Sequence, residues 1–182
     1  MAYLTGMVLF VIGCFIGLRF ADFDYWFRWN PLLVHRSLLT HSVLMPLLLF
    51  RAFRGNADPA ARLFVIGVCV ASAVHLAFDL FPSGWYGYAR VHVPFYGHVS
   101  ALPSQAWLFV NAVVSLYLAC LLLRNVGEFY FSFVGLAVTY GIAAAAQPRI
   151  SFYALVVLAL AAPIAFVLPR RPVKPEQFAP RL

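Results

Sequence analysis

The chain has 182 residues, of which 64% are hydrophobic and only 10% are charged, and its mean hydropathy is +0.87. Soluble domains carry about 25% charged residues, so this composition excludes an ordinary soluble protein and indicates an integral membrane protein. The net charge of +7 does not indicate nucleic-acid binding, because no basic stripe with interleaved aromatic residues occurs along the chain.

Six hydrophobic runs are long enough to be interpreted as membrane-spanning helices, which need about 20 apolar residues. In chain order these runs cover residues 2–20, 31–50, 63–81, 106–123, 129–146 and 152–168. The second run is interrupted by His35, Arg36 and His41, and the third contains His75 and Asp79, whereas the last three contain no charged residue. We therefore predict an all-α fold: a polytopic membrane helical bundle of about six transmembrane helices, forming one domain over residues 1–168.

The segments outside these runs have distinct compositions. Asn30 and Pro31 are a plausible cap and first residue for the second helix. Residues 82–104 are rich in Gly, Pro and aromatic residues, which predicts a segment lying at the level of the lipid headgroups. The tail, residues 169–182, is basic and Pro-rich, and we predict that it is disordered.

The distribution of basic residues predicts the orientation. Six spans would place both termini on one side, and that side carries eight Lys and Arg residues against five on the other. Because cytoplasmic loops carry an excess of Lys and Arg, we expect a multi-pass protein of a cell membrane, such as the bacterial inner membrane, with cytoplasmic termini.

In this topology all five histidines and three of the six acidic residues fall on the side opposite the termini. His75 and Asp79 are four residues apart, so on a helix they share one face, and they could be a plain hydrogen-bonded pair. Ionisable residues within spans are costly and usually mark function. Mixed imidazole and carboxylate donors suit Zn²⁺, Mn²⁺ or Fe²⁺. The candidate ligands are Asp22, Asp24, His35, His41, His75 and Asp79, whereas His92 and His98 are expected to be interfacial.

These polar residues form three blocks that occur in a fixed order. The blocks are Asp22-Phe23-Asp24, His35-Arg36-Ser37-Leu38-Leu39-Thr40-His41-Ser42, and a His75-x3-Asp79 pair followed by a turn with Pro82 and Gly84. In this order they resemble the YdjM-type family of membrane-bound, predicted metal-dependent hydrolases, over roughly residues 15–100. The resemblance implies a metal site and hydrolysis.

The second block departs from the family pattern. The step between its histidines is six residues instead of five, and Ser37 replaces a glycine, so this stretch looks closer to a sister group of proteins predicted to bind metal. On one helix, a step of six would separate the two side chains by about 120° at 3.6 residues per turn. We therefore expect His41, rather than His35, to be a ligand.

Our leading hypothesis is a metal-dependent hydrolase acting on a phosphoester or lipid-linked substrate at the membrane surface. A bound metal ion, with Zn²⁺ ahead of Mn²⁺ and Fe²⁺, would lower the pKa of its water towards about 7. His41, His75 and Asp79 would be the core ligands, and Asp22 and Asp24 would complete the site or support it.

Two residues are assigned catalytic roles in this hypothesis. Asp24 would be the general base, and Arg36 would face an anionic group of the substrate such as a phosphate, unless it only reaches for the lipid headgroups. The expected partners are membrane lipid and a small-molecule or lipid substrate.

Three alternatives remain open on sequence grounds. The first is a non-catalytic metal-binding or metal-transport protein, although the charge-free last three runs argue against a polar path through the bilayer. The second is a haem or quinone protein using His41 and His75, against which the neighbouring aspartates argue. The third is a structural membrane protein.

Overall fold

The structure, a computed structural model, describes residues 2–27, 29–30, 32–56 and 58–167. Over these ranges the fold is helical, with a single hairpin of two short antiparallel strands, β1 (His92–Val93) and β2 (Gly97–His98). The prediction of an all-α helical bundle is confirmed. Pro31 of the predicted cap and the tail, residues 169–182, lie outside the described residues.

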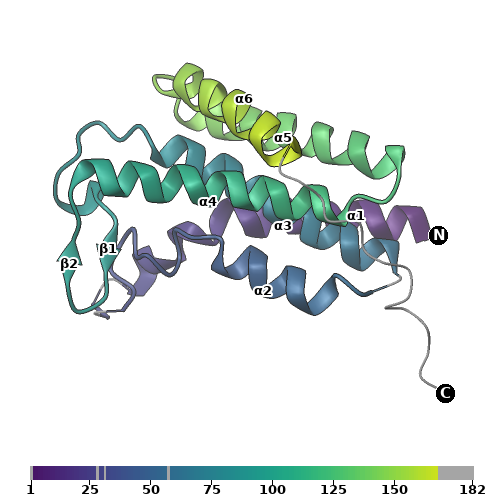
Figure 1. Ribbon diagram of the computed structural model, residues 1–182, viewed down its shortest axis with the longest axis horizontal. Helices are drawn as coiled ribbons and strands as arrows, with labels where there is room; N and C mark the ends of the chain where they lie inside the picture. The colour runs from purple at the N-terminus through teal and green to yellow at the C-terminus, as the bar shows by residue number, and fades with distance from the viewer. Residues whose placement is uncertain (1, 28, 31, 57, 168–182) are drawn as a thin grey trace.

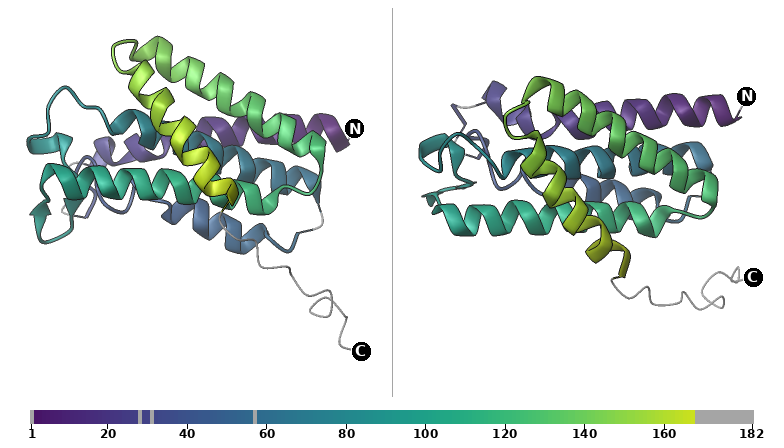
Figure 2. Two further views of the ribbon diagram at one scale, coloured as in Figure 1. Left: turned by 45° about the horizontal axis from the view of Figure 1, so that its top comes forward. Right: turned by 90° about the horizontal axis from the view of Figure 1, so that it is seen from above.

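The helices run back and forth along one long axis (Figure 1). They are α1 (Ala2–Arg19), the 3-10 helix η1 (Ala21–Phe27), α2 (Leu44–Phe53), α3 (Pro59–Asp79), the 3-10 turn η2 (Gly87–Ala89), α4 (Ala101–Leu122), α5 (Val126–Ala146) and α6 (Ser151–Val167). The end of α1, the end of α3 and the start of α4 therefore lie at the same end of the bundle, beside η1 and the hairpin, in Figures 1 and 2 alike.

Among the described residues, three helices are long and apolar enough to cross a membrane, namely α3, α4 and α5. A fourth span results if α1 and η1, which meet at a bend of 54°, are taken together. The expectation of six spans is therefore wrong. Helix α2 has 10 residues, so at 1.5 Å per residue it covers only about half of a hydrocarbon core of about 30 Å. Helix α6, with 17 residues, also falls short of the length expected for a span.

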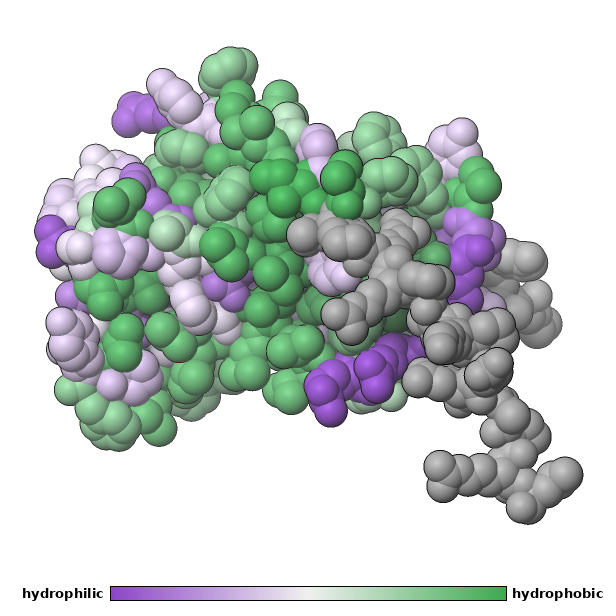
Figure 3. All heavy atoms as spheres, viewed as in Figure 1, coloured by the Kyte–Doolittle hydropathy of each residue, from purple (hydrophilic) through white to green (hydrophobic). Residues whose placement is uncertain are grey.

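Helix α3 is the centre of the bundle. In its most apolar window 83% of the residues are buried, whereas the corresponding fraction for α5 is 17%, so α5 lies on the outside. The side chains that α5 exposes are apolar, among them Phe133, Val134, Val138 and Ile142. Figure 3 shows hydrophobic residues dominating the middle of one face of the molecule, with hydrophilic residues mostly towards its two ends, as expected for a surface in contact with lipid.

Helices α1 and α3 approach each other closely through glycines. A methyl group added to Gly13 would overlap the carbonyl oxygen of Phe64, and one added to Gly17 would overlap the carbonyl oxygen of Val68. Small residues four apart on a helix allow such close backbone packing in membrane proteins. This contact holds the end of α1, and the residues that follow it, against the last turns of α3.

At the other end of the bundle, α5 begins three residues before the predicted run and includes Glu128. Its Oε1 lies 2.6 Å from Nη2 of Arg62, and its Oε2 accepts a hydrogen bond of 2.7 Å from the backbone of Arg124. Asn125 caps the same helix by accepting a bond of 2.9 Å from the Glu128 amide. The expectation that the last three helices are free of charge is therefore wrong at this position.

Removal of this buried carboxylate is expected to destabilise the fold strongly. A Glu128→Ala variant leaves Arg62 as a buried charge without its carboxylate, which typically costs about 3–5 kcal/mol. The double variant Arg62→Met with Glu128→Leu should recover much of that loss, because neither charge then remains buried. Thermal unfolding in detergent measures both effects, and equal unfolding temperatures for wild type and Glu128→Ala would contradict the expectation.

Candidate metal centre

Three elements bring the predicted site residues together at one end of the bundle. Asp22 and Asp24 lie on η1, directly after the bend that follows α1. His75 and Asp79 lie in the last turns of α3. The histidines of the second block lie in the irregular segment 32–43, where a continuous helix was predicted. That prediction is wrong because the backbone of this segment is hydrogen-bonded to other parts of the chain.

His41, from the irregular segment, and His75, from α3, form the centre of the site. The rings of His41 and His75 are 5.7 Å apart between centroids. One ligand atom from each of Asp22, His41 and His75 lies within 4.8 Å of the other two, so the three could hold a metal ion together. The carboxylate Oδ1 of Asp22 is 3.8 Å from Nε2 of His75.

Asp79 lies against both imidazoles. Its Oδ2 is 3.0 Å from Nε2 of His41 and 3.3 Å from Nε2 of His75. Despite these short distances, none of the three atoms makes a hydrogen bond of good geometry with the described residues, and all three are buried. A buried polar atom without a partner costs about 1–3 kcal/mol, so three converging on one point fit the place of a cation.

The other nitrogen of each imidazole fixes the orientation of the ring. Nδ1 of His75 is 2.9 Å from the carbonyl oxygen of Leu18, and Nδ1 of His41 is 3.2 Å from Oδ2 of Asp24. With the proton on Nδ1 in both rings, each Nε2 directs its lone pair towards Asp79, as metal-binding histidines do. Burial lowers the pKa of His41, but the hydrogen bond to Asp24 and the negative charges of Asp24 and Asp79 outweigh it and raise the pKa to about 9, so a metal ion at Nε2 would take the place of a proton there.

Asp24 is completely buried and organises the segment that carries His41. Its Oδ2 accepts hydrogen bonds from the amide of Ser37 at 3.1 Å and from the hydroxyl of Thr40 at 2.5 Å. Its Oδ1 lies 3.1 Å from Nδ1 of His35. With four donors around it, Asp24 is placed to hold His41 in position, while its predicted roles as ligand and general base stay predictions.

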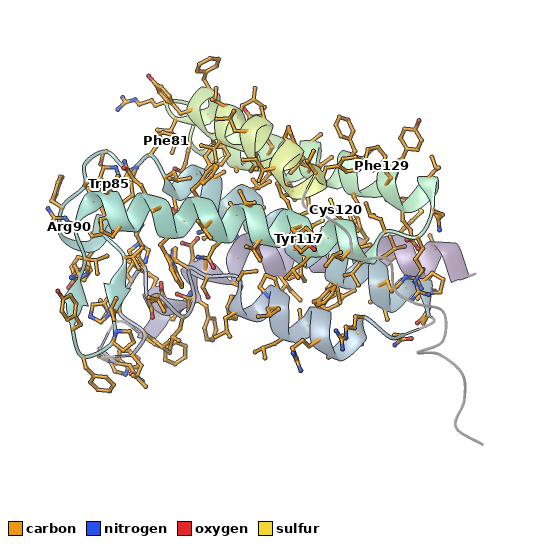
Figure 4. The ribbon with its side chains drawn as sticks, viewed as in Figure 1. Phe81, Trp85, Arg90, Tyr117, Cys120 and Phe129 are labelled. Atoms are coloured by element: carbon orange, nitrogen blue, oxygen red, sulfur yellow. The ribbon has the colours of Figure 1, made fainter. Side chains whose placement is uncertain are left out.

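Arg36 is also buried, and it holds Asp79 from the side away from the histidines. Its Nη2 is 3.0 Å from Oδ1 of Asp79, and its Nη1 donates to the carbonyl oxygen of Ala89. The guanidinium lies 6.0 Å from the centre of the Trp85 ring, which belongs to the loop that Figure 4 shows between α3 and the hairpin. Both terminal nitrogens are thus engaged, so this geometry makes Arg36 a positioning residue, and its predicted contact with a substrate anion stays a prediction.

The backbone of Arg36 is left-handed, with φ of 59°. A non-glycine residue in this region is strained by about 1–3 kcal/mol and persists only where its surroundings hold it. Here the carbonyl oxygen of Arg36 accepts from the amide of His92 at 2.9 Å, and the amide of Leu38 donates to the carbonyl of His92 at 2.8 Å. The hairpin therefore fixes the segment that presents Arg36 and His41.

An Arg36→Lys variant is expected to bind metal about 10–100-fold more weakly, because residues that orient a ligand contribute that much to affinity. Lysine cannot donate to Asp79 and to Ala89 at the same time in this geometry. Arg90→Lys is the matched control, since Arg90 donates to the carbonyl of Trp85 in the same loop and forms no hydrogen bond or ion pair with Asp79. Chelator competition measures both affinities, and equal losses in the two variants would contradict the assignment.

The remaining candidates lie around this centre. His35 is hydrogen-bonded to Asp24, and its ring is 5.8 Å from that of His41. It is not one of the three residues whose ligand atoms converge, in keeping with the preference for His41. His92 and His98 pair across the hairpin with ring centroids 5.0 Å apart, and burial lowers the pKa of both.

Sequence reasoning missed two contributors to the site, the hairpin and the carbonyl oxygen of Leu18. The hairpin carried a signal in Gly97, which adopts a φ of 99° that favours glycine. A backbone carbonyl has no signal in the sequence. The centre opens to the surface through a cavity of about 120 Å³, which Arg19, Asp22, His75 and Asp79 help to line.

Comparisons with protein-family models, with curated proteins and with solved structures find no match for this chain. The chemistry of the centre therefore has to be inferred from its own residues.

Proposed function

We propose that this chain is a membrane protein that binds a divalent metal ion at one end of its helical bundle and uses it to hydrolyse a phosphoester or lipid-linked substrate. The observation that carries the proposal is the convergence of His41, His75 and Asp79, whose three facing atoms are buried without hydrogen-bond partners among the described residues. The order of the three sequence blocks, similar to that of YdjM-type proteins, supports the same interpretation.

Two imidazoles with one or two carboxylates form a donor set suited to Zn²⁺, with Mn²⁺ and Fe²⁺ as alternatives. A metal ion bound there would act as a Lewis acid and lower the pKa of a bound water molecule to about 7. Held by two imidazoles and one carboxylate, such an ion would still have room for a water molecule, as catalytic zinc ions do.

The surrounding residues would position the ligands and supply the general base. Asp24 would hold His41, and Arg36 would hold Asp79. Asp22 is half exposed at the mouth of the cavity, so it is the carboxylate that solvent and substrate can reach. We assign the general-base role to Asp22 in place of the enclosed Asp24.

The proposal extends to location. Apolar helices α3, α4 and α5 would cross a cell membrane, and the metal centre would lie at one lipid–water boundary.

Turnover tests the hydrolytic part. Purified protein loaded with Zn²⁺ should release nitrophenol from bis(p-nitrophenyl) phosphate, or phosphate from a lysophosphatidic acid, and Asp22→Asn should lose this activity. Failure of both substrates with metal bound would favour the second candidate, a non-catalytic metal-binding protein. The small opening favours that candidate, since about 120 Å³ is below the roughly 300–1,000 Å³ of most ligand pockets.

A further inference from the structure

An apolar groove lies on the outside of the bundle between α1 and α5, which are inclined to each other in both views of Figure 2. Its volume is about 400 Å³. On α1 it is lined by one helical stripe from Met7 to Leu18, and on α5 by one stripe from Phe131 to Ile142. The two helices touch within it through Phe10 and Phe131, whose rings meet edge to face at 6.3 Å between centroids.

The groove leads to the metal centre. Leu18, Arg19 and Ile142 line both the groove and the 120 Å³ opening, whose other walls include Asp22 and His75. The carbonyl oxygen of Leu18 also accepts the hydrogen bond that orients His75. A molecule lying in the groove would therefore bring one of its ends directly to the candidate ligands.

The shape and charge of the groove select the kind of molecule. From Met7 to Leu18 the stripe is about 16 Å long at 1.5 Å per residue, and the lining of the groove from both helices is almost entirely apolar, which suits an alkyl chain. At the junction with the opening lies Arg19, whose side chain is exposed and makes no hydrogen bond or ion pair with the described residues. A guanidinium in this place suits a phosphate group.

We infer that the α1–α5 groove binds the acyl chain of a single-chain phospholipid, with its phosphoester beside Arg19 and the metal centre. This inference rests on the proposed function and names its substrate class. A second apolar groove, of about 440 Å³, is lined by residues of α3, α4, α5 and α6 that include Cys120 and Phe129 (Figure 4). It shares no lining residue with the opening, so it offers an internal comparison.

The experiment uses lysophosphatidic acid with a photoactivatable diazirine in its chain, added to the purified Zn²⁺-loaded protein in detergent. Peptide mapping by mass spectrometry should place the label on residues 7–18 and 131–142. Val138→Trp, which fills the groove from α5, should reduce the labelling about tenfold, which corresponds to about 1.4 kcal/mol. Val110→Trp is the matched control, because Val110 is an exposed residue of α4 that lines neither groove.

Competition experiments show whether the chain or the phosphate group of the lipid is recognised. Excess unlabelled hexadecyl phosphate should abolish the labelling, whereas inorganic phosphate at the same concentration should leave it unchanged. Arg19→Gln should weaken competition by hexadecyl phosphate but not by hexadecanol. Competition by inorganic phosphate alone would overturn the inference, since the chain would then contribute nothing.

Two further outcomes would overturn the inference: label spread evenly over the exposed helices, or an equal loss in the two tryptophan variants. Metal analysis of the same samples separates this failure from that of the proposed function. If a protein that binds no metal is labelled specifically, lipid binding in the groove is supported and the proposed metal centre is contradicted. If metal is bound but the labelling is unspecific, the metal centre is supported and lipid binding in the groove is contradicted.

Discussion

An Asp24→Ala variant is expected to lose both metal binding and about 3–5 kcal/mol of stability, the usual loss when one partner of a buried charged network is removed. The carboxylate is fully buried and faces His35, His41, Ser37 and Thr40. Without it, the amide of Ser37 loses its acceptor, the hydroxyl of Thr40 keeps only a longer contact of 3.3 Å with the carbonyl oxygen of Ser37, and Nδ1 of His41 loses its carboxylate partner. Thermal unfolding and chelator competition in detergent measure the two losses.

Asp58→Ala is the matched control for this variant. Asp58 caps α3 at the opposite end of the bundle by accepting a hydrogen bond of 2.9 Å from the amide of Ala60. Loss of such a cap costs about 1 kcal/mol and should leave metal affinity unchanged. If Asp24→Ala kept the stability and the affinity of the wild type, Asp24 would have no positioning role.

The second large effect is expected at the contact between α1 and α3. A Gly17→Leu substitution drives a side chain into the backbone of Val68, so the two helices must separate. Overpacking in a well-packed interior costs about 1–3 kcal/mol, and more where backbone has to move. Because Gly17 precedes Leu18, whose carbonyl orients His75, metal affinity should fall together with the unfolding temperature.

Gly141→Leu separates this effect from a general intolerance of leucine. A side chain added at Gly141, on α5, meets no atom within 4 Å among the described residues, and leucine has the higher helix propensity. This variant should unfold at the wild-type temperature or above it. Equal destabilisation of the two variants would show that close packing of α1 on α3 is not what holds the site.

The local part of the site could be predicted from the sequence, and the long-range part could not. His75 and Asp79 share one face of α3, as their spacing of four residues indicates, and their Nε2 and Oδ2 atoms are 3.3 Å apart. The contact between Asp24 and His41 spans an irregular segment, for which no periodicity exists. The pairing of Asp24 with His41, and that of Arg36 with Asp79, depend on how the segment from η1 to residue 43 packs against α3.

The error over the second span has a physical cause. Residues 31–50 are apolar enough to suggest a helix, but hydropathy does not reveal whether backbone groups are satisfied within a helix or elsewhere. Here Ser37 donates its amide to Asp24 and pairs with His92, so the helix begins only at Leu44. The glycines at 13 and 17 were a readable signal of close helix packing, because small residues four apart mark such contacts.

The central claim is that His41 and His75 coordinate the same metal ion. Metal content of the detergent-purified protein, measured by mass spectrometry for the wild type, His41→Ala and His75→Ala, tests it most directly. We expect bound zinc in stoichiometric amount in the wild type and its loss from both variants, with all three folded by circular dichroism. Equal metal content in the three folded proteins would contradict the account.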